Sequence, residues 1–70
     1  MEMHYVDSSN VDQIGFDEAE KEVHVIFKKG DHYVYSDVSQ DVWEAFRNSV
    51  SKGSFIHQEF RSKGYSCRKR

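Results

Sequence analysis

The stretch from Val23 to Val38 constrains the fold most, because two runs of alternating apolar and polar residues flank a Lys-Lys-Gly-Asp turn. A period of two is typical of half-buried β-strands, and a short glycine-containing connection between two such runs predicts a β-hairpin. We therefore predict antiparallel strands over about residues 22–28 and 32–36. An earlier alternation around Ile14 and Phe16 predicts a strand over about residues 11–17, which completes a three-stranded antiparallel β-meander.

The length of the hairpin loop decides which side chains share a face. If Lys28-Lys29-Gly30 is a three-residue loop with Gly30 at positive φ, Val25 lies opposite Tyr33. A loop of two or four residues would instead turn the tyrosines to the face of His24 and Ile26. We favour the first register because it gathers the larger apolar group beneath the helices: Val23, Val25, Phe27, Tyr33 and Tyr35.

A first helix is expected over about residues 40–50. Ser39 is a good N-cap, since its side-chain oxygen accepts a hydrogen bond from a free backbone N–H of the first turn. Gly53 is expected to end this segment as a C-cap residue. The apolar residues at helical spacing predict its buried stripe, which comprises Val42, Trp43, Ala45, Phe46 and Val50.

A second, shorter helix is expected over about residues 54–63, with Ser54 as its cap and Gly64 as its end. Both helices are predicted to pack on one face of the sheet, which gives a two-layer α+β domain. The buried side of the second helix is predicted to hold Phe55, Ile56 and Phe60.

The composition is that of one small folded domain over residues 1–70, with 37% hydrophobic and 31% charged residues. The longest apolar run is Val25 to Phe27, so we expect no membrane-spanning segment or signal peptide and a cytoplasmic location. Cys67 is the single cysteine, which excludes an internal disulfide and a cysteine-based zinc site.

Charge is distributed unevenly along the chain. Residues 1–20 hold six acids and no Lys or Arg, residues 21–51 have a net charge of −1, and residues 52–70 have a net charge of +5; together these give the formal net charge of −2. A basic end of this kind is typical of a segment that contacts nucleic acid or another acidic partner. The alternatives are that the acidic and basic ends simply attract each other, or that the tail is a solubility feature. Residues 66–70 are expected to form a frayed basic tail.

The order and spacing of these residues resemble the KTSC domain, a family found at the C-terminus of some lysyl-tRNA synthetases and as small free-standing proteins. The resemblance spans about residues 6–65, and Ser39 and His57 depart from the family pattern. It implies an accessory role, and the attachment to a synthetase implies RNA binding by association. The motifs that carry it are Val6-Asp7-Ser8-Ser9-Asn10-Val11, Ile14-Gly15-Phe16-Asp17, the run Val23 to Val38, Trp43-x-x-Phe46, Ser51-Lys52-Gly53-x-Phe55 and Phe60-Arg61.

Candidates for catalysis or metal binding are weak. The four histidines come from separate segments without ligand spacing, although His24 and His32 are expected to be neighbours across the hairpin. Ser51, His57 and Glu59 would splay apart on a helix and form no catalytic triad. We therefore expect a non-catalytic protein with no metal and no cofactor.

Two groups of residues are candidates for contacts with single-stranded nucleic acid. Tyr33 and Tyr35 alternate on a strand, as base-stacking aromatics do in RNA-binding modules, but the same pattern fills a core beneath helices, and we favour the core. The alternative function is a protein-interaction or small regulatory module. The candidates for phosphate contacts are the basic residues Lys52, Arg61, Lys63, Arg68, Lys69 and Arg70.

Overall fold

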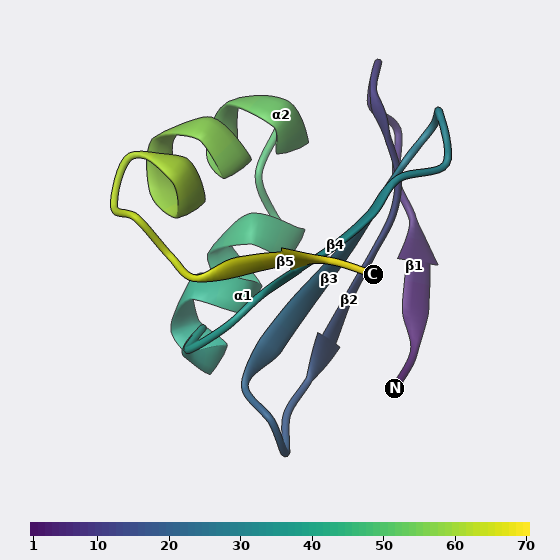
Figure 1. The fold of residues 1–70 in the computed structure, drawn as a ribbon. Helices are drawn as coiled ribbons and strands as arrows, with labels where there is room; N and C mark the ends of the chain where they lie inside the picture. Colours follow the sequence, from purple (N-terminus) through teal and green to yellow (C-terminus); the bar gives the residue numbers. More distant parts are fainter.

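Five antiparallel strands form a single sheet in the computed structural model, which describes residues 1–70, and their order in the sheet is their order in the chain (Figure 1). The predicted α+β class is confirmed, but the predicted three-stranded meander is wrong because one further strand lies at each edge. The strands are β1 (Met3–Tyr5), β2 (Val11–Asp17), β3 (Glu22–Phe27), β4 (His32–Tyr35) and β5 (Cys67–Lys69).

The β3–β4 hairpin has the predicted register. The Phe27 N–H donates to the Asp31 carbonyl over 2.8 Å, which encloses a three-residue loop. Gly30 adopts a φ of 104°, a conformation that a side chain would disfavour. Val25 consequently lies opposite Tyr33, and the next pair on this face is Val23 with Tyr35.

The two edge strands are held by backbone pairing. In β1, Met3 lies opposite Gly15, where a Cβ would come within 2.9 Å of the Glu2 carbonyl oxygen and would clash with the Met3 sulfur, so glycine is needed. In β5, Cys67 pairs with Tyr35, and the Arg70 N–H donates to the His32 carbonyl over 2.7 Å. The prediction of a frayed tail at residues 66–70 is therefore wrong, since this segment contains a strand of the sheet.

The first helix, α1 (Gln40–Arg47), is shorter than predicted. Ser39 caps it as expected, because its Oγ accepts from the Val42 N–H over 3.3 Å. It ends at Arg47 with Asn48 as C-cap, so Gly53 does not end it. Val50 is fully exposed and does not continue the buried stripe.

The second helical segment consists of α2 (Lys52–Phe55), which continues directly into the π-helix η1 (Ile56–Arg61). Its cap is Ser51, whose Oγ accepts from the Ser54 N–H, so the prediction of Ser54 as cap was three residues late. Gly64 follows it at a φ of 72° and ends the segment as predicted.

Three aromatic rings five residues apart pack in a row along the second helical segment and the turn that follows it. Phe55 and Phe60 have ring centroids 5.7 Å apart, and Phe60 and Tyr65 have centroids 5.2 Å apart. Phe60 lies in η1, whereas Phe55 ends α2 and Tyr65 follows the turn at Gly64, where the Tyr65 N–H donates to the Phe60 carbonyl over 3.0 Å. We infer that packing of this aromatic row helps to hold the segment and its terminal turn together.

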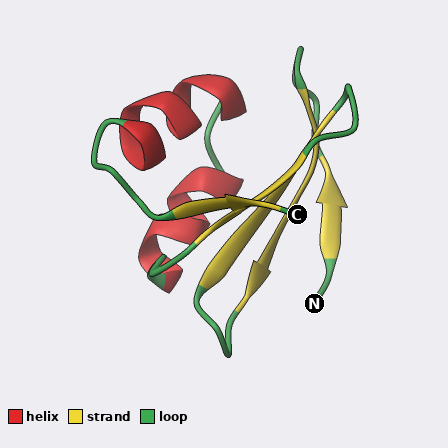
Figure 2. Ribbon diagram, in the orientation of Figure 1, coloured by secondary structure: helices red, strands yellow, loops and turns green.

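Both helical segments cover one face of the sheet, as predicted, and the core lies between the two layers (Figure 2). Trp43 and Phe46 of α1 and Ile56 and Phe60 of the second segment are buried, as predicted. None of the helices has the length and apolar composition needed to cross a bilayer. The core comprises Val11, Ile14, Val23, Val25, Tyr35, Val38, Trp43, Phe46, Ile56 and Phe60.

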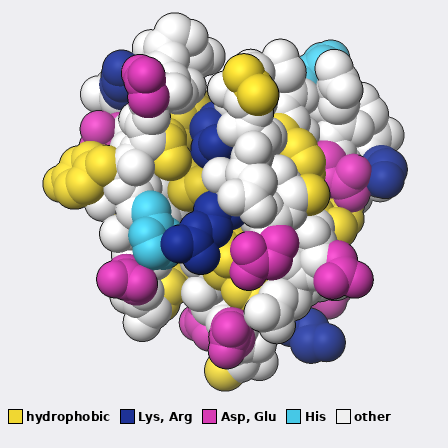
Figure 3. Space-filling model, turned by 180° about the vertical axis from the view of Figure 1, so that it is seen from behind, with side chains coloured by type: hydrophobic (Ala, Val, Ile, Leu, Met, Phe, Trp, Pro, Cys, Tyr) yellow, Lys and Arg dark blue, Asp and Glu magenta, His cyan; other side chains and the backbone are white.

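The opposite face of the hairpin holds a histidine pair. His24 is 3% exposed, and its Nδ1 lies 2.9 Å from Nε2 of the half-buried His32. Burial is the main cause that lowers the pKa of both rings, and the Arg70 charge lowers both further. In a view from behind, Figure 3 shows basic, acidic and histidine side chains interspersed over the surface, without one continuous basic patch.

Candidate nucleic-acid interface

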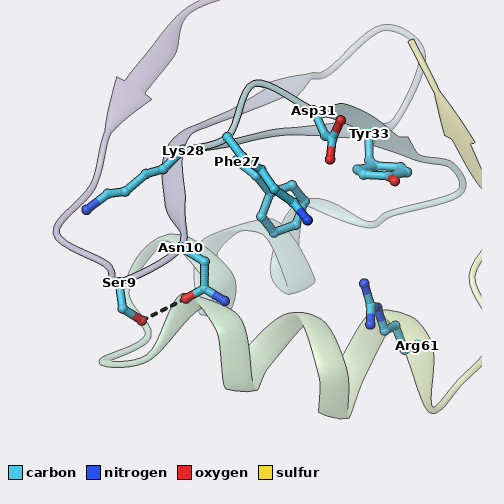
Figure 4. A pocket seen from close by; sticks show the side chains of 8 residues that line it. Ser9, Asn10, Phe27, Lys28, Asp31, Tyr33 and Arg61 are labelled. Carbon is cyan, nitrogen blue, oxygen red and sulfur yellow. Dashed lines mark hydrogen bonds between the residues drawn. The ribbon is translucent and has the colours of Figure 1, made fainter.

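A furrow runs between the β3–β4 hairpin and the second helical segment. Figure 4 shows the hairpin residues on one side and Arg61, carried by the helix, pointing toward them from the other. The furrow encloses about 480 Å³, and its lining combines cationic, aromatic and small polar side chains. These are Ser9, Asn10, Phe27, Lys28, Lys29, Asp31, Tyr33 and Arg61.

The turn between β1 and β2 forms one end of the furrow. The Lys28 N–H donates to the Asn10 carbonyl over 2.8 Å, which ties this turn to the hairpin loop. The Ser9 Oγ donates to Asn10 Oδ1 over 2.7 Å, shown as the dashed line in Figure 4. Two chain segments distant in sequence are thus fixed beside each other by the backbone, with exposed polar groups between them.

Two smaller hollows meet the furrow at Arg61 and lengthen it. One, of about 100 Å³, lies toward Ile56 and His57, and the other, of about 270 Å³, lies toward Tyr65 and Cys67. Both include Arg61 in their lining, so this residue borders all three spaces. An extended ligand could therefore pass along the hairpin while keeping contact with one central cation.

The aromatic side chains of the furrow are Phe27 and Tyr33, both half-buried, with ring centroids 5.8 Å apart in an edge-to-face arrangement. Tyr35 is different: it is 3% exposed and stacks on Phe60 with centroids 4.7 Å apart. Burial raises the pKa of Tyr35 above its ordinary value. Tyr35 is thus a core residue, and Tyr33 is the one of the two tyrosines that retains partial access to the furrow.

The cations of the furrow are not neutralised by acids of the protein, although Arg61 also interacts with the Tyr35 hydroxyl. Lys28, Lys29 and Arg61 are exposed and take part in none of the ion pairs of the molecule. The single acid of the lining, Asp31, is paired with Lys69 over 3.3 Å. The furrow therefore carries an excess of positive charge although the whole chain is slightly acidic.

The other predicted basic residues do not gather into one surface. Arg68 binds Glu22 through two hydrogen bonds of 2.8 and 3.2 Å, and this contact lowers the pKa of Glu22. Lys63 pairs with Glu59 over 2.9 Å, and hydrogen bonds from Lys63 and Tyr65 lower the pKa of that carboxyl.

Lys52 and Arg70 complete the set of predicted basic residues, and both lie away from the lining of the furrow. Lys52 is only 8% exposed and donates its Nζ to the Ser49 carbonyl after α1. Arg70 lies beside the histidine pair. Only Arg61 of the predicted basic residues lines the furrow.

The sequence reasoning missed Lys28, Lys29, Phe27 and the Ser9-Asn10 turn as site residues. The available signal was the hairpin loop itself, which places two adjacent lysines at the end of a strand pair. We treated them as turn residues because nothing in the sequence indicated that the β1–β2 turn and η1 would lie beside them. No cluster of three or more His, Cys, Asp or Glu side chains could hold a metal ion.

Comparison with known proteins decides the family. The model of the KTSC domain matches residues 7–65. The chain belongs to the KTSC domain family. A crystal structure of a KTSC domain protein from Yersinia pestis superposes with a TM-score of 0.85 at 28% identity, covering 99% of this chain and 96% of that one. A search of curated proteins found no match.

Proposed function

We propose that this KTSC domain is a non-catalytic accessory module that binds single-stranded nucleic acid, RNA above all, along the furrow. The observation that carries the proposal is the set of three unpaired cations, Lys28, Lys29 and Arg61, around two half-buried aromatic rings. Lysine and arginine neutralise phosphates, whereas aromatic rings stack on exposed bases. The combination of both groups in one elongated hollow is typical of single-strand binding surfaces.

The binding contacts divide between the two walls. Lys28 and Lys29 come from the hairpin loop and Arg61 from the helix, so a phosphate backbone between the walls would meet cations on both sides. Tyr33 would stack on a base, and the Ser9-Asn10 turn offers hydrogen-bonding groups to a base edge. The phosphate contacts are thus assigned to Lys28 and Lys29 of the hairpin loop together with Arg61, and no longer to the C-terminal residues 66–70.

The test is fluorescence anisotropy with a labelled oligouridine, titrated at several salt concentrations. Three phosphate contacts on a single strand predict a slope of log K against log salt of about −2. Lys28→Gln combined with Lys29→Gln should bring the slope to about −0.7, since one contact remains. The matched control is Lys63→Gln, which removes a lysine that lies in an ion pair outside the furrow and should leave the slope unchanged.

A second pair of variants tests stacking. Tyr33→Leu should weaken binding by about 1–3 kcal/mol if a base stacks on this ring. Tyr5→Leu is its control, because Tyr5 is 79% exposed and lies on β1 away from the furrow. Absence of binding to oligouridine and to single-stranded DNA at low salt, where phosphate contacts are strongest, would refute the proposal.

The competing function is a protein-interaction module whose furrow takes an acidic peptide, since the same cations would attract carboxylates. Competition separates the two. Polyglutamate should displace oligouridine poorly if Tyr33 stacks on bases, because carboxylate side chains offer no ring. If polyglutamate displaces labelled oligouridine as well as unlabelled oligouridine does at the same concentration of charges, the acidic-peptide function is favoured.

A further inference from the structure

A second groove lies at the end of the sheet opposite to the furrow. In Figure 1 the β2–β3 turn and the N-terminus are at the lower end of the sheet, whereas the β3–β4 loop is at the upper end. This second groove, which we call the acidic groove, encloses about 360 Å³. It is lined by Met1, Glu2, His4, Phe16, Asp17, Glu18 and Trp43.

The three carboxylates of the acidic groove have no basic partner. Glu2, Asp17 and Glu18 form no ion pair with any Lys or Arg of the chain, whereas Glu22, Asp31 and Glu59 each do. The ionisable ring that lines the groove is His4, whose Nε2 lies 3.8 Å from Glu2, a distance that gives attraction only when the ring is protonated. An exposed site with unpaired carboxylates attracts a cation from outside the molecule.

The floor of the groove is aromatic. The half-buried Phe16 ring stacks on Trp43 with centroids 5.6 Å apart and an angle of 13° between planes, and the His4 ring lies 6.3 Å from Trp43. A flat aromatic surface beside carboxylates suits a long basic side chain. Its methylene stem can lie on the rings, and its charged head can pair with the carboxylates.

Trp43 also presents an unused hydrogen-bond donor. The residue is 5% exposed, and none of the side-chain hydrogen bonds of the molecule involves its indole N–H. Since no fully buried side-chain nitrogen lacks a partner, this N–H has to reach the surface, and the groove is the hollow that Trp43 lines. A ligand group that replaces water at this N–H has to be an acceptor, which a bare ammonium ion is not and a peptide carbonyl is.

We propose that the acidic groove binds a lysine- or arginine-bearing peptide segment. The basic head group pairs with the carboxylates of Glu2 and Glu18, the methylene stem lies on Phe16, and a peptide carbonyl accepts from the Trp43 indole. A metal ion does not fit these residues, because no three of the chain's acid or histidine side chains come together around one point. A nucleic acid is repelled by the same carboxylates, so this site is independent of the furrow.

The single tryptophan of the chain makes the test site-specific. The probe is an acetylated peptide of alternating lysine and alanine, titrated at low salt while Trp43 fluorescence is recorded. We expect a saturable change with a dissociation constant on the order of 0.1 mM, as for a small contact of exposed ion pairs. The same peptide with glutamate in place of lysine should give no change.

Two variants test the residues. Glu2→Gln combined with Glu18→Gln should weaken peptide binding by about twofold to thirtyfold, because two exposed ion pairs are lost. The control Glu44→Gln removes an exposed acid that lies outside the groove on the Trp43 helix and should change nothing. Asp17 is left in place since its Oδ1 accepts from the Glu20 N–H and shapes the turn.

Three results would overturn the proposal. One is an unchanged Trp43 signal up to millimolar peptide, and another is equal affinity in the Glu2/Glu18 variant. The third is a reversible dimer in sedimentation that Lys28→Gln with Lys29→Gln abolishes, because the occupant would then be the β3–β4 hairpin loop of a second copy. Oligouridine binding is expected to survive the Glu2/Glu18 substitutions, so failure of this proposal and failure of the nucleic-acid proposal are distinguishable.

Discussion

The histidine pair predicts that the protein loses stability as the pH falls from about 7.5 to about 5.5, through the ordinary histidine pKa of about 6.5. Between His24 Nδ1 and His32 Nε2, 2.9 Å apart, there is room for one proton. Protonation of both rings sets two N–H groups against each other. Burial, aided by Arg70, lowers both pKa values, while Glu22 and Asp17 oppose this at His24.

The sign and the size of the change in the free energy of unfolding with pH follow from this arrangement. The folded protein binds fewer protons than the unfolded chain, so the full stability is present above pH 6.5 or so and declines below it. Loss of the shared hydrogen bond costs about 0.5–1.5 kcal/mol, and a buried polar group left unsatisfied costs about 1–3 kcal/mol. We expect a total loss of roughly 1–3 kcal/mol. For 70 residues this is a substantial part of a stability of about 4–10 kcal/mol.

The assay is urea unfolding followed by Trp43 fluorescence at three pH values across this range. His24→Leu should remove more than half of the pH dependence, because it removes the more buried ring. His57→Gln, at an exposed histidine, is the control and should retain it. Glu22 and Glu59 do not contribute to the pH dependence of stability between about pH 5.5 and 7.5, since the pKa of each is lowered from an ordinary value of 4.5 that already lies below this range. A wild-type midpoint that stays constant down to about pH 5.5 would refute the reasoning.

Three further predictions concern the sheet. Gly15→Ala should lower the free energy of unfolding by about 1–3 kcal/mol, because the new Cβ meets the Glu2 carbonyl oxygen. Amide hydrogen exchange should then be fastest in β1, and unchanged exchange of that strand would contradict the prediction. Gly30→Ala should cost about 1 kcal/mol from its φ of 104° alone, measurable by urea unfolding, since a Cβ there meets no atom within 4 Å. Deletion of residues 66–70 should lower the melting temperature and expose the β4 backbone to exchange, whereas a frayed tail would leave both unchanged.

The hairpin was predictable because its information is local. Gly30 fixes the loop conformation, and alternation then fixes which side chains lie opposite each other. The end of α1 was not predictable in the same way, since Gly53 is a good stop residue in general but here adopts ordinary helical geometry inside α2. The second segment contains a π-helical part in which Phe60 packs on Phe55 and on Tyr65, and no local pattern in the sequence predicts this winding.

The edge strands and the site depended on contacts between distant segments. β5 is rich in charged residues and has no apolar alternation, so only its pairing with β4 makes it a strand. The partner of Arg68 is Glu22, 46 residues earlier, and no local pattern connects the two. For the same reason Lys63, Arg68 and Lys69 of the basic end are neutralised by ion pairs with acids of the fold, whereas the two lysines of the hairpin loop form no ion pair.

The position of β5 at the margin of the sheet gives its charges a role in solubility. An edge strand presents unpaired backbone groups that can recruit another chain, and proteins resist this with short edges that carry charged side chains. β5 has three residues, all exposed, and two of them are Arg68 and Lys69. Arg68 reaches across β4 to Glu22 at the start of β3, and Lys69 pairs with Asp31 in the β3–β4 loop, so ion pairs hold both side chains near this margin of the sheet. We infer that the short, charged β5 disfavours pairing of this edge with another chain, independently of any ligand.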